Sequence, residues 1–240
     1  MSDKPLALVT GAAHRLGKAF ALKLARMGYS VALHYHGSLT EAEKTAEEIR
    51  ALGVDCLPIR ADLTNIEGVD SLFSMLDEFH APLRIVVNSA SIMPVGNPRD
   101  LELQQWDDAL NLNLRAPFFI AQKAAKRMTE GGLIVNISDI GAQKAWSRYP
   151  SYTVSKAALD SLTKVLARSL APQIRVNAIA PGLALPSDFV TSEQWDALVK
   201  KLPLKRAATL DEITMTLEFL IKNEYITGQT IAVDGGYSLI

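Results

Sequence analysis

The stretch LALVTGAAHRLGKAFALKLARMG, residues 6–28, joins a short apolar run to an amphipathic one through a turn that contains glycine. Residues 6–10 are continuously apolar up to a threonine, which predicts a strand buried on both faces. Residues 16–27 place apolar side chains three or four positions apart, which predicts a helix with one apolar face, and Gly28 can end it. A strand that leads through a tight turn into a helix is typical of a crossover in a parallel sheet.

The turn itself, TGAAHRLG at residues 10–17, has features of a phosphate-binding loop. Gly11 permits a tight turn, Gly17 lets the helix pack closely on the strand, and free N–H groups at the helix start suit a pyrophosphate. Arg15 replaces the middle glycine of the usual dinucleotide-binding pattern. The turn alone therefore leaves two interpretations open, a phosphate site and an ordinary joint between strand and helix.

The same alternation of apolar runs and helical stretches continues to the end of the chain. Helix 40–53 is typical: Thr40 and Glu43 form a capping-box pattern, and Gly53 can end the helix. The pattern predicts an α/β fold, with one Rossmann-type, doubly wound domain over residues 1–240 and a seven-stranded parallel sheet covered by helices on both faces. The other strands are predicted at residues 30–35, 56–61, 84–89, 133–138, 174–180 and 229–234.

The composition excludes several classes of function. The chain has 240 residues, 48% of them hydrophobic, and a formal net charge of −1. This balance offers no basic surface for nucleic acid, and the apolar runs are too short to span a membrane. The N-terminus lacks the features of a secretory signal and Cys56 is the only cysteine, so we expect a cytoplasmic protein that acts on a small-molecule substrate.

The second predicted strand ends in HYHGS, residues 34–38, which indicates the type of cofactor. No Asp or Glu is present there to hold a ribose 2′-hydroxyl group. Arg15, His36 and Ser38 instead suit a 2′-phosphate, and the arginine can form a bidentate pair with it. This predicts NADP(H) rather than NAD(H), although His36 by itself is also compatible with an ordinary surface histidine.

The stretch SDIGAQKAWSRYPSYTVSK, residues 138–156, contains two tyrosines, an aspartate and a closing lysine. Tyr152 and Lys156 are four positions apart, so they share one face of a helix. Tyr149 has no lysine at that spacing, and it precedes Pro150, which favours an extended backbone. On spacing alone, the alternative is a polar helix start with a surface lysine.

Several motifs, in order and across nearly the whole chain, resemble those of the short-chain dehydrogenase/reductase family. The segments TGAAHRLG, LHYHGS and VDGGYSL are most similar to the pteridine reductases within it. The family usually has serine thirteen positions before the tyrosine, whereas this chain has Asp139, as the pteridine reductases do. The motifs are TGAAHRLG (10–17), ADL with Asp62, NSAS (88–91), NLNLRAPFF with Asn113, YTVSK (152–156), RVNAIAPG (175–182) and ITGQTIAVDGGYSL (226–239).

The resemblance implies catalytic and cofactor-binding roles. It implies that Tyr152 donates a proton, and that Lys156 binds the nicotinamide ribose and lowers the tyrosine pKa from its usual value of about 10. Asn113 is implied to hold a water that links the lysine to solvent. Contacts with NADP(H) are implied for both Tyr152 and Lys156 and for Gly11, Arg15, Leu16, Gly17, His36, Ser38, Asp62, Leu63, Asn88, Ala90, Pro181 and Gly182, and no metal is expected.

Asp139 indicates which bond is reduced. A serine at this position can only hydrogen-bond a substrate oxygen, whereas a carboxyl group can also carry a proton to a ring nitrogen during reduction of a C=N bond. The alternative is an aspartate that caps the loop after the fifth strand.

Residues 183–207 are predicted to form a substrate lid, because long connections after the strands of an open sheet cover its crevice. Met93 stands where the pteridine reductases have an aromatic ring that stacks on the pterin. The alternative for Met93, and likewise for Trp195 and Leu198, is that the side chain packs in the core and does not contact substrate. The residues predicted to line the substrate site are Ser91, Met93, Leu183 and Trp195.

Three functions are compatible with these residues: an NADPH-dependent reductase of pteridine-like substrates, a ketone reductase of 3-oxoacyl thioesters, and a non-catalytic NADP(H)-binding sensor. Asp139 favours the first over the second, and the presence of Asn113, Tyr152 and Lys156 together argues against the third. The family resemblance also implies a homotetramer. Its expected contacts are the helices 101–128 and 152–170, through Leu112, Phe118, Leu162 and Leu166.

Overall fold

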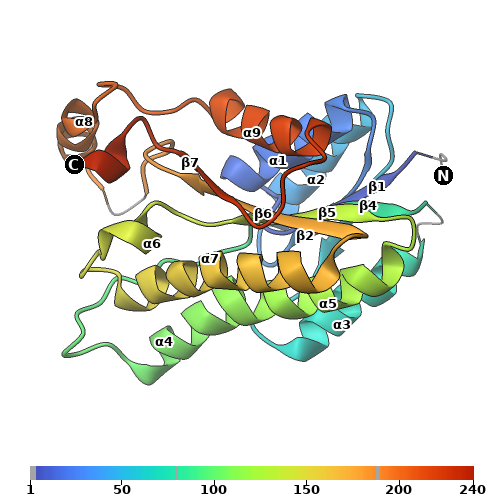
Figure 1. Cartoon of the computed structure of the whole chain (residues 1–240), viewed down its shortest axis with the longest axis horizontal. Helices are drawn as coiled ribbons and strands as arrows, with labels where there is room; N and C mark the ends of the chain where they lie inside the picture. Colours follow the sequence, from blue (N-terminus) through green and yellow to red (C-terminus); the bar gives the residue numbers. More distant parts are fainter. Residues whose placement is uncertain (1–3, 79–80, 188–189) are drawn as a thin grey trace.

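A parallel sheet runs through the middle of the molecule, as the sequence predicts. The computed structural model describes residues 4–78, 81–187 and 190–240, and within these ranges the sheet has seven strands in the order β3-β2-β1-β4-β5-β6-β7 (Figure 1). The strands are β1 (Leu6–Val9), β2 (Ser30–Tyr35), β3 (Cys56–Arg60), β4 (Leu83–Asn88), β5 (Gly132–Ile137), β6 (Ile174–Pro181) and β7 (Thr230–Val233).

Helices cover both faces of the sheet, which explains why its central strands are almost entirely apolar. In Figure 1, α1, α2 and α9 lie above the sheet, and α3, α4, α5 and α7 lie below it. Each face has its own cluster of buried side chains. The helices are α1 (Arg15–Arg26), α2 (Leu39–Arg50), α3 (Ile66–Met75), α4 (Leu103–Leu110), α5 (Ala116–Arg127), α6 (Gly141–Lys144), α7 (Pro150–Leu170), α8 (Ser192–Lys201) and α9 (Leu210–Lys222).

Among the described helices, none is long and apolar enough to cross a membrane. Short helical turns complete the chain at η1 (Leu76–Glu78) and η3 (Tyr237–Leu239).

Two helices differ from the sequence-based expectation. The helix expected over 101–128 is divided, because the π-helical turn η2 (Asn111–Arg115) separates α4 from α5. Helix α2 begins at Leu39 with Ser38 at the N-cap, so the capping box expected from Thr40 and Glu43 does not form. Gly53 does adopt a positive φ of 78° just beyond this helix, as expected of a residue that ends it.

Buried polar side chains cross the sheet between β4, β5 and α7. The Asn88 and Asn136 residues are register partners on the two strands, and the Asn88 amide donates to Asn136 Oδ1 at 2.8 Å. The Asn136 amide in turn donates to Thr163 Oγ1 at 2.9 Å, and the Thr163 hydroxyl donates to the Leu159 carbonyl at 2.8 Å. These bonds provide partners for most of these buried polar atoms in an otherwise apolar interior, although the Asn88 side-chain oxygen has none among the described residues.

The strand order reverses between β1 and β4, since the chain builds the sheet outward from β1 in both directions. In open parallel sheets, ligands bind beyond the carboxyl ends of the strands at such a reversal. The segments that leave β1, β4, β5 and β6 therefore form the place to look for a functional site.

Candidate active site

The turn between β1 and α1 requires glycine at two positions. Gly11 has a φ of 64°, and a Cβ atom there would lie 2.8 Å from Ala90 Cα. A Cβ on Gly17 would lie 2.1 Å from the Gly11 carbonyl oxygen, so a side chain cannot fit between the turn and the helix. Both glycines thus permit the close approach that the sequence predicts for a phosphate-binding turn.

His34 fixes this turn to the rest of the sheet, a role that no sequence motif indicated. Its Nδ1 accepts a hydrogen bond from the Gly11 N–H at 3.1 Å, so its Nε2 carries the proton that is donated to the Ala61 carbonyl, also at 3.1 Å. Burial lowers the pKa of His34 to about 4, despite the opposing effect of the Ala61 carbonyl. The imidazole is therefore neutral at physiological pH and holds the turn in place through both nitrogens.

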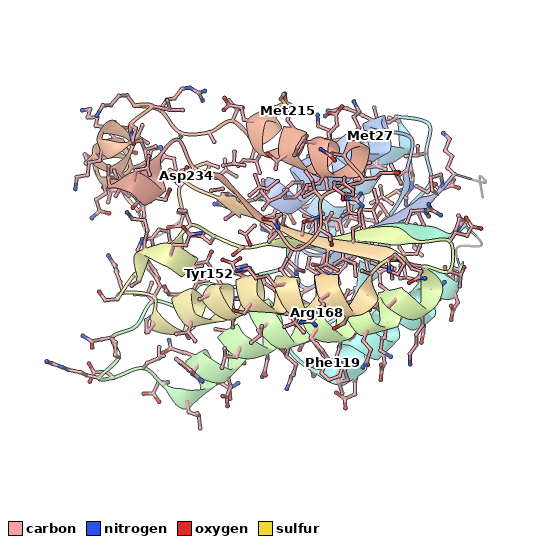
Figure 2. All side chains as sticks on the ribbon, viewed as in Figure 1. Met27, Phe119, Tyr152, Arg168, Met215 and Asp234 are labelled. Atoms are coloured by element: carbon pink, nitrogen blue, oxygen red, sulfur yellow. The ribbon has the colours of Figure 1, made fainter. Side chains whose placement is uncertain are left out.

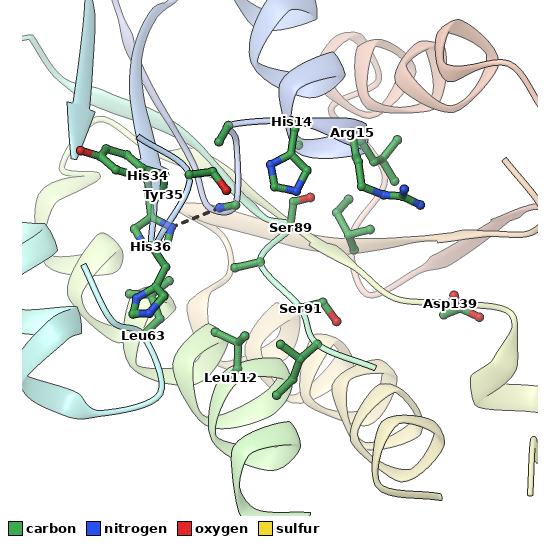
Figure 3. Close-up of a pocket in the computed structure, with 18 of the residues that line it drawn as sticks. His14, Arg15, His34, Tyr35, His36, Leu63, Ser89, Ser91, Leu112 and Asp139 are labelled. Carbon is green, nitrogen blue, oxygen red and sulfur yellow. Dashed lines mark hydrogen bonds between the residues drawn. The ribbon is translucent and has the colours of Figure 1, made fainter. Parts of the chain in front are cut away.

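A cleft of about 730 Å³ lies beyond the strand ends, and Figure 3 shows the side chains around it. This volume and the glycine-lined turn fit a dinucleotide. Of the residues predicted to bind the cofactor, the cleft is lined by Gly11, Arg15, Leu16, Gly17, His36, Ser38, Asp62, Leu63, Ala90, Tyr152, Lys156, Pro181 and Gly182.

Asn88 does not line this cleft, contrary to expectation. It is the last residue of β4, and its amide is buried against Asn136 instead. Ser89 follows it and lines the cleft, although it was not among the expected cofactor contacts. The Asp62 carboxylate accepts hydrogen bonds from the N–H and the hydroxyl of Thr64, and these bonds hold its pKa below the usual value.

Arg15 lines the same cleft as His36 and Ser38, but its side chain does not point toward them. Its backbone has a positive φ of 54°, and its guanidinium donates to the Pro186 carbonyl at 2.9 Å. In Figure 3 the side chain points toward the side of the cleft where Asp139 lies, away from His36. His14, which was also not among the expected contacts, lines the cleft and is closer to His36 than Arg15 is in that view.

Asp139 and Tyr152 meet at the inner end of the cleft. The Tyr152 hydroxyl donates to Asp139 Oδ2 at 2.8 Å, and the Gly141 N–H donates to Asp139 Oδ1 at 2.6 Å. The two interpretations of Asp139 are therefore compatible, since it caps the loop after β5 and also contacts the candidate acid. Burial raises the pKa of Asp139, although both hydrogen bonds and the Lys156 charge act in the opposite direction.

Lys156 lies one helical turn further along α7, on the same face as Tyr152. Its Nζ donates to the Ile137 carbonyl at 2.7 Å and lies 5.6 Å from the centre of the Tyr152 ring. Burial lowers the pKa of Lys156 to about 8. Burial and the Asp139 carboxylate raise the pKa of Tyr152 well above its usual value, so a net lowering of the kind expected from Lys156 is not seen here.

Asn113 lies in the π-helical turn and uses its whole side chain to hold the segment after β4. Its Oδ1 accepts from the Ser91 hydroxyl and the Ile92 N–H, both at 3.0 Å. Its Nδ2 donates to the Ile92 carbonyl at 2.9 Å and to the Ser155 hydroxyl at 3.0 Å. The side-chain amide is thus fully engaged within the protein and fixes the position of the cleft wall, while the water expected at this residue stays a prediction.

A second cavity of about 800 Å³ adjoins the cleft, and Asp139, Arg15, Gly182 and Leu185 line both. Helix α8 forms one wall of this cavity, as expected for part of the predicted lid at 183–207, of which residues 188–189 lie outside the described part of the chain. Of the predicted substrate-lining residues, Met93, Leu183 and Trp195 line this cavity, as does Leu198. Ser91 lines the first cleft but not this cavity.

Aromatic rings that were not expected at the site enclose the same cavity. The ring centre of Trp146 lies 6.3 Å from that of Tyr149 and 6.2 Å from that of Tyr237, and all three residues line the cavity. Lys144 holds Tyr237 in place, since its Nζ donates to the Tyr237 carbonyl at 3.0 Å and lies 4.7 Å from the ring centre. The sequence signal for this wall is the aromatic pair in KAWSRY, residues 144–149.

The arrangement is thus a glycine-lined cleft joined to an aromatic cavity, with a phenol, a carboxyl group and a lysine where the two meet. In the described part of the chain, no three His, Cys, Asp or Glu side chains gather to hold a metal ion. A family model described as enoyl-(acyl carrier protein) reductase matches residues 11–238. The chain belongs to the short-chain dehydrogenase/reductase family.

The names of three relatives of this short-chain dehydrogenase/reductase give three different activities. The 3-oxoacyl-(acyl-carrier-protein) reductase FabG of Staphylococcus aureus is 37% identical over 237 residues, which cover 96% of both chains. The crystal structure of FolM alternative dihydrofolate reductase 1 from Brucella suis, in complex with NADP, is 40% identical with a TM-score of 0.94. That match covers 100% of this chain and 97% of the Brucella chain. The crystal structure of the angucycline C-6 ketoreductase LanV, with bound NADP, is 33% identical with a TM-score of 0.92. That match covers 98% of this chain and 96% of the LanV chain.

As a member of this family the chain is an oxidoreductase, so a non-catalytic sensor is no longer an alternative. The seven-stranded fold predicted from the sequence is confirmed by these solved structures.

Proposed function

We propose that this short-chain dehydrogenase/reductase is an NADPH-dependent reductase of a pteridine-like substrate, a dihydropterin or a folate. The observation that carries the proposal is the hydrogen bond from Tyr152 to the Asp139 carboxyl group at the junction of cleft and cavity. A carboxyl group with a raised pKa can hold a proton and deliver it to a ring nitrogen, which a serine hydroxyl in the same place does poorly.

The cofactor assignment rests on the cleft. Gly11 and Gly17 leave room for a pyrophosphate at the start of α1, while His36 and Ser38 line the end that suits a 2′-phosphate. The Brucella and LanV structures contain NADP. When bound, the reduced nicotinamide supplies hydride.

The protein's own residues would control the proton. Burial and the neighbouring carboxylate raise the pKa of Tyr152 and keep the phenol protonated, so it is a donor at physiological pH. Lys156 is buried, and its ammonium group donates a hydrogen bond to the Ile137 carbonyl. Because its pKa is about 8, the group is mostly charged at pH values below 8. Asp139 would deliver its own proton to the substrate, while its hydrogen bond with the Tyr152 hydroxyl orients the two groups.

One alternative keeps specific support. Met93 stands where pteridine reductases have a stacking ring, and curated relatives such as the Staphylococcus aureus enzyme and that of Synechocystis are 3-oxoacyl-(acyl-carrier-protein) reductases. The alternative substrate is therefore a 3-oxoacyl thioester. The aromatic wall of Trp146 and Tyr149 offsets the loss of the stacking ring and favours the pteridine.

The variant Asp139→Ser separates the two functions. We expect it to abolish NADPH oxidation with dihydrobiopterin or dihydrofolate, because the proton for the ring nitrogen is lost, and to spare or create oxidation with a 3-oxoacyl thioester. Initial rates with the three substrates, measured for the native protein and the variant, provide the test. An unchanged substrate profile would show that Asp139 only orients or caps, and the pteridine proposal would lose its main support.

A further inference from the structure

The cavity beside Asp139 carries more positive than negative charge. Its described lining includes Arg15, Arg148 and Lys201, with Asp139 as the one carboxyl group. Asp139 is engaged by Tyr152 and by the Gly141 N–H, so it is not available to neutralise these cations.

Arg148 and Lys201 have no partner among the residues described. Arg15 donates to the Pro186 carbonyl, whereas no hydrogen bond or ion pair in residues 4–78, 81–187 and 190–240 involves the side chain of Arg148 or Lys201. Both residues are exposed, while the Asp139 end of the cavity is more deeply enclosed. The two free cations therefore lie at the outer part of the cavity, and the proton-carrying group lies at its inner part.

The two cations come from opposite walls. Arg148 belongs to the connection between α6 and α7, and Lys201 is the last residue of α8. Figure 1 shows α8 above the level of the sheet and α6 below it, at the same end of the molecule. The aromatic side chains of Trp146, Tyr149 and Trp195 line the space that the two walls enclose.

We propose that Arg148 and Lys201 bind an anionic group, a carboxylate or a phosphate, at the end of the substrate that is remote from the reduced ring. The proposal rests on the function proposed above, since that function places the ring beside Asp139 and Tyr152. An unpaired guanidinium and an unpaired ammonium at the mouth of an aromatic cavity attract an anionic tail, and they bind a neutral hydroxylated tail more weakly because it lacks the opposite charge. The preferred pteridine is therefore one with an acidic tail, as in the folates.

The test compares two substrates with the same reducible ring. Dihydrofolate carries carboxylates on its tail, and dihydrobiopterin carries a neutral one. We expect the double variant Arg148→Gln/Lys201→Gln to raise KM for dihydrofolate by roughly 5–50-fold, the effect of losing charge-assisted contacts at an exposed site, with kcat maintained. For dihydrobiopterin, KM should change less than about 2-fold, because no charged contact is lost.

A binding measurement provides a readout independent of turnover. 4-Aminobenzoylglutamate, the tail without the pterin, should quench the fluorescence of Trp146 and Trp195 in the native protein and should do so far more weakly in the double variant. Raised ionic strength should weaken this binding too, because exposed charge pairs are screened by salt.

Matched control residues are available on α8, which carries Lys201, and on α7, which follows Arg148 in the chain. Lys200 is the neighbour of Lys201 on α8 but does not line the cavity, and Arg168 is exposed near the other end of α7 from Tyr152 (Figure 2). Lys200→Gln and Arg168→Gln should leave KM for dihydrofolate unchanged. Similar losses in these controls, or equal losses with both substrates, would overturn the proposal.

The remaining outcomes are also decisive. If the native protein reduces both pteridines and the double variant retains its KM for dihydrofolate, the anion site is refuted while the proposed function stands. If the native protein reduces neither pteridine, the proposed function fails, and acetoacetyl-coenzyme A becomes the probe. A rise in its KM in the double variant would then identify phosphate as the anion, and an unchanged KM would refute the site.

Discussion

The hydrogen bond between Tyr152 and Asp139 shows how two acids can share one site with different roles. The phenol donates and the carboxyl group accepts, so the bond raises the cost of ionising the tyrosine and stabilises the carboxylate. Two groups whose surroundings set their pKa values apart in this way can divide the work of proton delivery. The phenol of Tyr152 therefore remains protonated to higher pH than the carboxyl group of Asp139.

At this scale we expect Tyr152, and not Tyr149, to be the proton donor. Tyr152→Phe keeps the ring but removes the donor, so turnover should fall by roughly 10²–10⁴-fold, the usual contribution of one acid–base group. Tyr149 lines the outer cavity and not the cleft where Lys156 lies, so Tyr149→Phe should change turnover little. Steady-state rates of both variants provide the measurement, and a large loss in Tyr149→Phe alone would contradict the assignment.

Single residues were predictable where a regular element fixes them. Tyr152 and Lys156 share a face because they lie on one helix, a relation that follows from their spacing. The direction of the Arg15 side chain was not predictable, because its backbone has a positive φ, which is uncommon for arginine, and its guanidinium donates to the Pro186 carbonyl. Tyr237 was missed because only tertiary structure brings the segment after β7 to the cavity.

The division of one expected helix into α4 and α5 belongs to the scale of elements. The π-helical turn at Asn111–Arg115 inserts one extra residue into the helical repeat, a change that apolar periodicity does not show. Asn113 lies within this turn and its side chain reaches the segment at Ser91 and Ile92. A short irregularity in a long helix thus positions the wall of the cleft.

His34, which joins β2 to the phosphate-binding turn, should make the free energy of unfolding depend on pH. Because the pKa of His34 falls from 6.5 to about 4 on folding, the unfolded chain binds a proton that the folded chain does not bind between these values. Stability should therefore decline as pH falls from about 6.5 to 4. His34→Gln retains an acceptor for the Gly11 N–H and a donor for Ala61 but does not titrate.

Urea unfolding at pH 7.5 and pH 5 measures this effect. Between these two pH values the native protein should lose about 2 kcal/mol more unfolding free energy than His34→Gln, the amount expected from a shift of this size. Parallel losses in the two proteins would show that His34 does not titrate as its burial implies.

The order of elements and the parallel sheet were predictable from the sequence, since continuous apolar runs between amphipathic helices leave few other arrangements for the whole molecule. The expected contribution of Leu166 to an outer surface was wrong, because this side chain is buried in the core below the sheet. Leu112 and Leu162 are half-buried, and Phe118 is 38% exposed as expected. The spacing of apolar residues predicts the apolar faces of a helix, but it does not predict which of these faces is exposed to solvent.

We propose that the molecule assembles as a homotetramer through this lower surface. Val154 and Val165 on α7 are 46% and 59% exposed, and α7 contacts α5, which carries Phe118. About three helical turns separate the two valines, so they share one face. Val165→Lys should shift the protein to smaller species in sedimentation velocity, since it would bury a charge in the interface. A native protein that sediments only as a monomer at micromolar concentration would refute the assembly.

The amide pair of Asn88 and Asn136 has a consequence for how this sequence can change over generations. Apolar residues of similar volume replace one another in a sheet at a cost of less than about 1.5 kcal/mol, so those positions can drift one at a time. Loss of either asparagine alone leaves a buried amide without its partner, at a cost of about 1–3 kcal/mol. The two positions, together with Thr163, therefore constrain one another's mutational history: a lineage retains all three or replaces them in concert.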